Sequence, residues 1–142
     1  MATSALTKVH QFSEDLAKGV HQFGTHQLKV ALCAAANAPT TSNSVLADLT
    51  QIAYTNCSAR EVTTTSCEQT TGTTKLILAD LTLTASGGSI AAFRYVVLYN
   101  DSPTSPADPL IGFYDYGADL TLASGESLLI DFDGTNGALT VA

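Results

Sequence analysis

The sequence predicts a mainly β protein: an antiparallel β-sandwich or jelly-roll-like domain with one or two short helices in its N-terminal third. From residue 60 onward, short segments rich in β-branched, aromatic and other apolar residues follow one another, and Gly, Asn, Asp or Pro separates them at short intervals. The length of 142 residues suits one domain and leaves no room for two independent cores. We therefore expect a single domain over residues 1–142.

The N-terminal third carries the helix signals. Residues 12–19 predict a short helix, because Ser13 can cap its start, acidic residues follow in its first turn, and Gly19 can end it. Residues 45–52 predict a second short helix, since their apolar residues recur at helical spacing. Between the two, alternating apolar positions over residues 28–32 predict a strand with one face inward.

The rest of the chain reads as strands. Residues 75–84 give the clearest strand, because apolar and polar residues alternate there. Residues 94–99 are apolar on both faces apart from Arg94, which is typical of a central strand covered on both sides. Residues 100–109 hold three of the four prolines and predict an exposed connection. Further strands are expected at 60–65, 110–116, 120–122, 127–132 and 138–141.

Residues 1–9 have no strong period and predict an N-terminal arm without a core position of its own. Such an arm would become ordered by lying on a neighbouring subunit, with Leu6 and Val9 buried against it. We therefore expect the arm to tether the subunit rather than to hold its fold together.

Composition excludes several classes of partner. Only 13% of residues are charged, against ~25% in typical globular proteins, which predicts that partners cover part of the surface. The net charge is −7 and the six basic residues are scattered, so neither nucleic acid nor an anionic membrane is an expected partner. No stretch approaches the ~20 apolar residues of a membrane span, and the N-terminus does not read as a signal peptide. We expect synthesis in the cytoplasm.

The histidines and acidic residues are the candidate ligand-binding residues of the chain. His21 and His26 lie five apart, a spacing that fits neither a helical nor a strand pair of metal ligands, so ordinary polar or interface roles are favoured over metal binding. His10 stands apart from both. Residues 131–137 superficially resemble a calcium loop, but the spacing differs from that of an EF-hand, and a turn between the last two strands is favoured.

Enzymatic motifs are missing from the sequence. It holds neither G-x-S-x-G nor a phosphate-binding loop, and its acidic residues are dispersed rather than paired. We therefore predict a non-catalytic protein with no catalytic, cofactor-binding or metal-binding residues. The three cysteines form no C-x-x-C and are expected to be free thiols; a Cys57–Cys67 bridge is the alternative, and it would need an oxidising environment.

Aromatic residues cluster on two predicted strands. Tyr95 and Phe113 are expected in the core, whereas other tyrosines fit a core or a contact patch equally well. Together with the apolar residues of the arm they make up the predicted interface: Leu6, Val9, Tyr99, Tyr114 and Tyr116.

Several segments resemble a group of small tailed-bacteriophage virion proteins. In the C-terminal half they are residues 93–101, 109–117 and 131–142, and upstream they are residues 14–21 and 46–52, so the likeness spans most of the chain. Members often carry Gly-Tyr-Thr-x-Gly-Gly after the second helix, but this chain has Ala-Tyr-Thr-Asn-Cys-Ser at residues 53–58.

The resemblance implies a particle component. Head decoration (cement) is the expected role, with the major capsid protein and further copies of the chain as partners. The expected location is then the capsid surface of the virion, after assembly in the host cytoplasm. A tail or baseplate module that recognises the host through residues 100–109 and the neighbouring tyrosines is the alternative, since fold alone does not separate the two roles.

Overall fold

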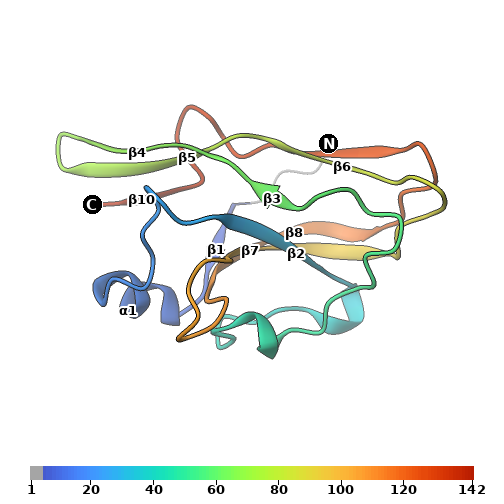
Figure 1. Cartoon of the computed structure of the whole chain (residues 1–142), viewed down its shortest axis with the longest axis horizontal. Helices are drawn as coiled ribbons and strands as arrows, with labels where there is room; N and C mark the ends of the chain where they lie inside the picture. The colour runs from blue at the N-terminus through green and yellow to red at the C-terminus, as the bar shows by residue number, and fades with distance from the viewer. Residues whose placement is uncertain (1–4) are drawn as a thin grey trace.

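The structure, a computed structural model, describes residues 5–142. It confirms the mainly β class, with 43% strand, 9% helix and antiparallel sheets that do not close into a barrel. The strands form two layers (Figure 1). The elements in chain order are β1 (Thr7–Lys8), α1 (Gln11–Ala17), β2 (Leu28–Cys33), η1 (Ala35–Asn37), η2 (Leu46–Asp48), β3 (Glu61–Val62), β4 (Thr64–Thr70), β5 (Thr73–Leu78), β6 (Leu81–Thr84), β7 (Phe93–Asn100), β8 (Leu110–Leu120), β9 (Ser127–Ile130) and β10 (Leu139–Val141).

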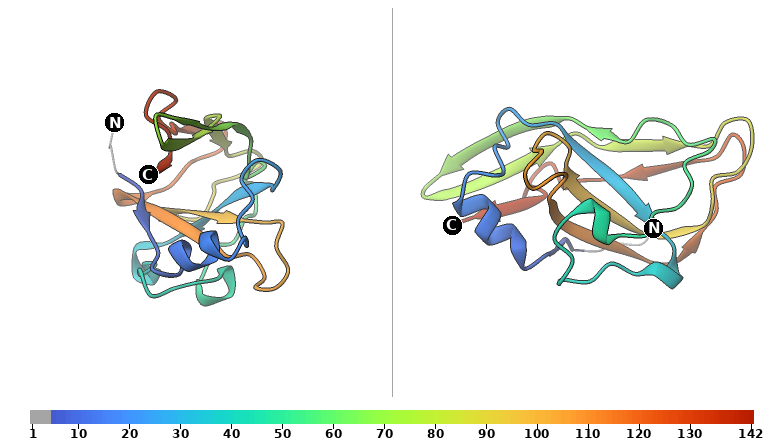
Figure 2. Two further views of the ribbon diagram at one scale, coloured as in Figure 1. Left: turned by 90° about the vertical axis from the view of Figure 1, so that its left-hand side faces the viewer. Right: turned by 60° about the horizontal axis from the view of Figure 1, so that its bottom comes forward.

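One layer is a five-stranded sheet in the order β1-β8-β7-β2-β3, with every pairing antiparallel. Strand β7 lies at its centre, as its apolar sequence predicts, and its last five residues are all buried. Both faces of this sheet are covered, because the second layer lies on one side and α1, η1 and η2 lie on the other (Figures 1 and 2).

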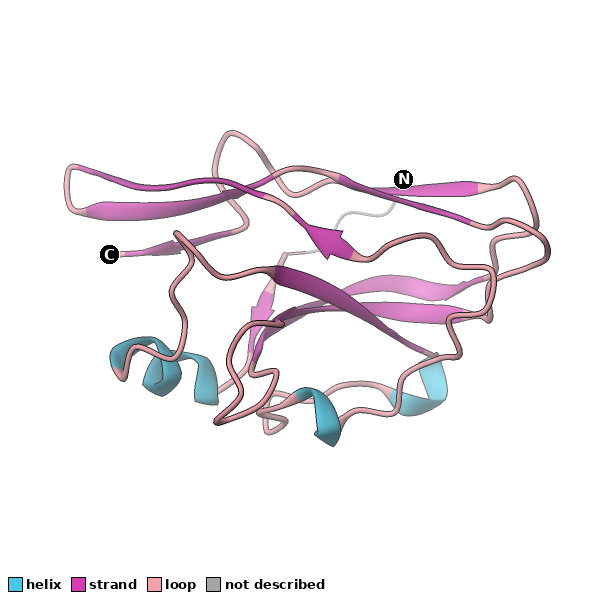
Figure 3. Ribbon diagram, viewed as in Figure 1, coloured by secondary structure: helices cyan, strands magenta, loops and turns pink. Residues whose placement is uncertain are grey.

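The second layer consists of two small sheets laid end to end (Figure 3). One has the order β10-β5-β4 and the other pairs β6 with β9. Along β5 and β6 the buried residues are Leu76 and Leu78, then Leu83, so one face of the layer points into the core. The largest fully buried side chains include Phe93, Phe132, Leu76, Leu83 and Ile90, and burying each contributes about 1.5–3 kcal/mol.

Residues 75–84 form two strands rather than the single strand expected. The inward-facing positions are 76 and 78 before the break but 81 and 83 after it, so the alternation slips by one residue at Ala79–Asp80. Two hydrogen bonds hold the break: Ala79 N–H donates to the Thr63 carbonyl (2.9 Å), and the Asp80 carboxylate accepts from Phe132 N–H (3.0 Å).

Of the two predicted helices, only the first forms as an α-helix. The first exists as α1, but it begins after His10 and no side chain caps it. The second is wrong, since only the 3-10 turn η2 forms within residues 45–52. After that turn Leu49 is extended, and Ile52 N–H donates to the Leu32 carbonyl at 2.9 Å. The hydrogen bond to β2 therefore favours an extended backbone over a helix in this segment.

The expectation that residues 1–9 lack a core position is also wrong for the part that the structure describes. Val9 is only 3% exposed, and its N–H donates to the Ile111 carbonyl at 3.2 Å. Thr7 and Lys8 pair with Phe113 and Gly112 of β8, within the same chain. This segment therefore forms an edge strand of its own sheet and does not need a neighbouring subunit to become ordered. Met1–Ser4 lie outside the described residues.

Candidate functional site

A buried polar cluster lies between α1 and the end of β7. It begins with a stack of rings in which His21 lies 5.4 Å from Phe12 and 5.4 Å from Phe23, between ring centroids. Burial lowers the pKa of His21 to about 4, although the nearby Asp15 carboxylate opposes this shift. The imidazole is therefore neutral at physiological pH.

Asn100 joins both histidines of this cluster. Its side-chain Nδ2 lies 3.2 Å from Nδ1 of His21 and 2.9 Å from Nδ1 of His26, while its Oδ1 accepts from Ser102 N–H at 3.2 Å. Because the amide nitrogen only donates, both Nδ1 atoms are acceptors, and the proton of the neutral His21 ring sits on Nε2. Each hydrogen of one amide group is thus used by a different histidine.

This arrangement favours a structural role over a catalytic one. The Nδ1 lone pair of His21 is occupied and its Nε2 carries hydrogen, so the neutral ring has no free site at which to accept a proton while the hydrogen bond from Asn100 is kept. Two buried side-chain atoms beside this cluster lack partners, Nε2 of His21 and Oδ2 of Asp15. Within residues 5–142 no group of three or more His, Cys, Asp or Glu side chains could hold a metal ion. The cluster ties three chain segments together.

The outer edge of β2 is sealed by side chains rather than by a full strand. Beyond the short pairing with β3, Val30 N–H donates to the Arg60 carbonyl (3.0 Å), and the Arg60 guanidinium donates to the Val30 carbonyl (2.6 Å). Leu32 N–H donates to the Tyr54 hydroxyl (2.9 Å), next to the bond from Ile52 already described. The Arg60 guanidinium also lies 3.6 Å from the centre of the Tyr54 ring, a cation–π contact that fixes both side chains.

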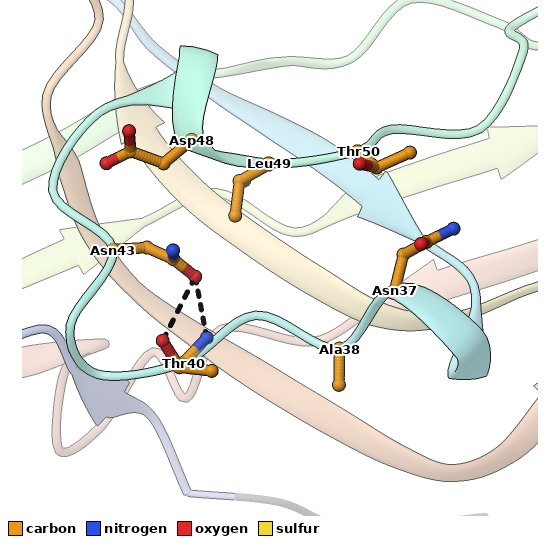
Figure 4. Close-up of a pocket in the computed structure, with 7 residues that line it drawn as sticks. All are labelled: Asn37, Ala38, Thr40, Asn43, Asp48, Leu49 and Thr50. Atoms are coloured by element: carbon orange, nitrogen blue, oxygen red, sulfur yellow. Dashed lines mark hydrogen bonds between the residues drawn. The ribbon is translucent and has the colours of Figure 1, made fainter.

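A shallow pocket of about 210 Å³ opens in the loop between η1 and η2 (Figure 4). Its polar groups serve the loop itself: Asn43 Oδ1 accepts from the backbone N–H of Thr40 at 2.7 Å, and Asp48 Oδ2 accepts from the N–H groups of Ser44 (2.9 Å) and Val45 (3.2 Å). These backbone donors lower the pKa of Asp48. The pocket is lined by Asn37, Ala38, Thr40, Asn43, Asp48, Leu49 and Thr50.

Residues 131–137 form the expected turn. Asp133 Oδ1 accepts from the N–H groups of Thr135 (3.0 Å) and Asn136 (2.9 Å), and hydrogen bonds from Asn136 lower the Asp133 pKa. The carboxylate is therefore used to shape the turn.

The cysteines are free, with Cys33 buried and Cys57 and Cys67 half-buried. The Cys57–Cys67 bridge does not form in this structure. Burial raises the pKa of all three thiols, that of Cys33 to about 11. They are protonated at neutral pH and are poor nucleophiles.

The predicted interface residues are not brought together as one patch. Val9 and Tyr99 are 3% and 2% exposed, so both belong to the core of the single chain and cannot line an exposed contact surface. Leu6, Tyr114 and Tyr116 are half-buried and lie on or beside β8, towards one edge of the five-stranded sheet. Burial raises the pKa of Tyr114 to about 12, and its ring lies 6.1 Å from that of Phe132.

Sequence reasoning missed Asn100, Tyr54 and Arg60. Asn100 was grouped with the loop that follows β7, and its two partners lie 79 and 74 residues away along the chain. No local pattern links an asparagine to histidines at such a distance. In the sequence, Arg60 is only one of the scattered basic residues.

No family model, curated protein or solved structure matches the chain. The resemblance to phage virion proteins therefore stays a prediction. None of the helices in the described part of the chain is long and apolar enough to span a bilayer.

Proposed function

We propose that the protein is a capsid decoration (cement) protein. In this role it is a non-catalytic domain that binds the outer surface of a tailed-bacteriophage head and reinforces the contacts between major capsid subunits. The observation that carries the proposal is a two-layer β domain with only 13% charged residues, in which the polar side chains of Arg60, Asn100 and Asp48 hydrogen-bond within their own chain. Such a surface suits contact with protein, and the net charge of −7 disfavours nucleic acid and anionic membranes.

Reinforcement follows from repetition of a modest contact. An interface of standard size buries ~800 Å² on each partner, and a rigid sandwich seated across a joint between two capsid subunits couples their movements. Repeated over the shell, many such contacts resist the pressure of the packaged DNA without any one of them being unusually tight.

The test is the copy number of the protein in purified particles, measured by quantitative mass spectrometry against the major capsid protein. A decoration protein is expected on the order of hundreds of copies, in a fixed ratio to the capsid subunit. It should also rebind empty heads from which it has been stripped. Absence from particles, or a handful of copies per particle, would contradict the proposal.

The alternative is a tail- or baseplate-associated module that binds the host through the loop after β7. One observation favours it: this loop is anchored at both ends, by Asp101 N–H to the Gln27 carbonyl (2.9 Å) and by Leu46 N–H to the Asp108 carbonyl (2.9 Å). Binding residues are commonly found on loops that a rigid scaffold holds in place. Because Tyr99 is buried, the contact would depend on the loop itself. Binding of the isolated protein to host envelope material, combined with a low copy number, would select this function.

A further inference from the structure

Strand β4 is an open edge of the second layer. It pairs with β5 on one side, and no strand of residues 5–142 pairs with its other side. Four of its seven residues are exposed and three are half-buried. With β5 it forms a long hairpin at one end of the molecule (Figure 3). A free strand edge presents unpaired N–H and C=O groups that can template pairing with another chain.

The hairpin geometry indicates which backbone groups face outward. Thr70 and Thr73 flank a two-residue turn, so they form a hydrogen-bonded pair, and Glu68 with Lys75 forms the next one. Hydrogen-bonded and non-hydrogen-bonded positions alternate along an antiparallel strand. The N–H and C=O groups of Cys67 and Gln69 therefore point away from β5, towards the open edge.

The molecule leaves this edge open while it seals another. At β2 the outward backbone groups of Val30 and Leu32 are satisfied by Arg60, Tyr54 and Ile52. Edges are commonly protected by lysine, proline, bulges or covering segments. No strand of the described residues pairs with the outer side of β4; the strand carries one charged residue, Glu68, and a register shift near its start, between Thr64 and Ser66.

We infer that β4 is a self-association surface, at which a second copy of the chain adds its own β4 antiparallel to the first. The inference deepens the proposed function, on which it rests for the expectation that copies meet, and it specifies where they do so. With Cys67 on the two-fold axis, Ser66 faces Glu68 of the second copy, so no like charges are opposed. Moving the axis to Glu68 would oppose two carboxylates, which is destabilising.

A closed pair is favoured over a head-to-tail chain of copies. The other outer strand of this sheet is β10, which has three residues against the seven of β4. Pairing β4 with β4 thus uses the longer outer strand of this sheet twice and leaves no strand of either copy to continue the series at that joint. The two-fold axis stands perpendicular to the sheet, so both copies keep their inward-facing residues on the same side.

The register can be tested at Ser66, whose side chain lies on the outer face and would be directly opposite Glu68 of the second copy. Each dimer contains this pair twice. We expect Ser66→Glu to weaken self-association roughly fivefold or more, Ser66→Lys to strengthen it, and the charge-swapped Ser66→Glu/Glu68→Lys variant to restore it. Thr82→Glu places the same charge on the exposed face of β6, away from the edge, and is the matched control.

Self-association of the full chain is measured by sedimentation equilibrium over a range of concentrations, with circular dichroism to check that each variant is folded. A wild-type protein that stays monomeric throughout would overturn the inference, as would equal effects of Ser66→Glu and Thr82→Glu. Should Ser66→Glu fail to fold, the strengthening expected of Ser66→Lys still decides the matter. If Ser66→Glu reduces binding to particles but leaves self-association unchanged, the edge binds the shell rather than a second copy, and the inference is overturned.

This outcome is separable from that of the proposed function. Copies that pair through β4 but are absent from particles would contradict the capsid role alone. A high copy number in particles, without any effect of the Ser66 variants on self-association, would contradict β4 pairing alone.

Discussion

Protonation of His21 should make the fold sensitive to mildly acidic pH. The side chain is 5% exposed, lies between two phenylalanine rings and uses Nδ1 to accept from Asn100. Its pKa is lowered from 6.5 to about 4, mainly by burial, with a smaller contribution from His26 in the same direction and an opposing one from Asp15. The unfolded chain therefore binds a proton at this residue well before the folded protein does.

The sign and size of the effect follow from this difference. The free energy of unfolding is unaffected by His21 above pH 6.5, falls as the pH drops from about 6.5 towards 4, and changes no further below that. Each pKa unit corresponds to ~1.4 kcal/mol. Between pH 7 and pH 5 the loss is about 2 kcal/mol, which is a large part of the ~5–15 kcal/mol that stabilises a typical domain.

The perturbation is His21→Gln, which removes the titrating group but keeps a side-chain oxygen able to accept from Asn100. Because the chain has no tryptophan, urea unfolding is followed by far-ultraviolet circular dichroism at pH 7, 6 and 5. The variant starts less stable, since the ring contacts are lost, but it should lose about 2 kcal/mol less than the wild type between pH 7 and pH 5. His10→Gln, at an exposed histidine outside the cluster, should keep the wild-type dependence. A His21→Gln variant with an unchanged pH dependence would refute the reasoning.

Two glycines and one turn residue give further predictions, and urea unfolding measures the stability change in each case. Gly112→Ala should cost about 1–3 kcal/mol, because its Cβ would lie 2.5 Å from the Thr7 carbonyl oxygen and push β1 off β8. Gly134→Ala, where nothing lies within 4 Å, should stay within ~0.5 kcal/mol, and equal costs at the two sites would contradict the steric argument. Thr71→Asn should stabilise the β4–β5 hairpin by about 0.5–1 kcal/mol, since Thr71 has a φ of +52° that asparagine adopts more readily; a loss of stability there would count against this account.

The sequence predicts a strand correctly where an apolar run alone determines its position in the fold. Residues 94–99 are apolar on both faces, and the strand they form is covered on both sides. Gly117 shows where this reasoning stops. It reads as a separator between two strands, yet β8 runs through it from Leu110 to Leu120, with Gly117 at a φ of +96°. A glycine marks a bend in the backbone but does not say whether pairing continues beyond it.

Non-local pairing explains the main errors. The spacing of Leu46, Leu49 and Ile52 is helical, and all three pack partly buried against the core, but a hydrogen bond from Ile52 to β2 overrides the local preference. Val9 was assigned to an arm because nothing in its neighbourhood shows that β8 is near. Only part of the polar cluster can be predicted from the sequence. The spacing of His21 and His26 is visible there, but their shared hydrogen-bond partner Asn100 is not, because it lies far away along the chain.

The sealed edge of β2 has a consequence for any joint between copies. Arg60 and Tyr54 stop the five-stranded sheet from growing at that edge, whereas the second layer is open at β4. A pair joined at β4 would thus be continuous through one sheet and interrupted in the other. A connection one sheet thick bends more easily than a double one. In the proposed capsid role, such a joint would follow both the flat facets and the curved corners of the shell.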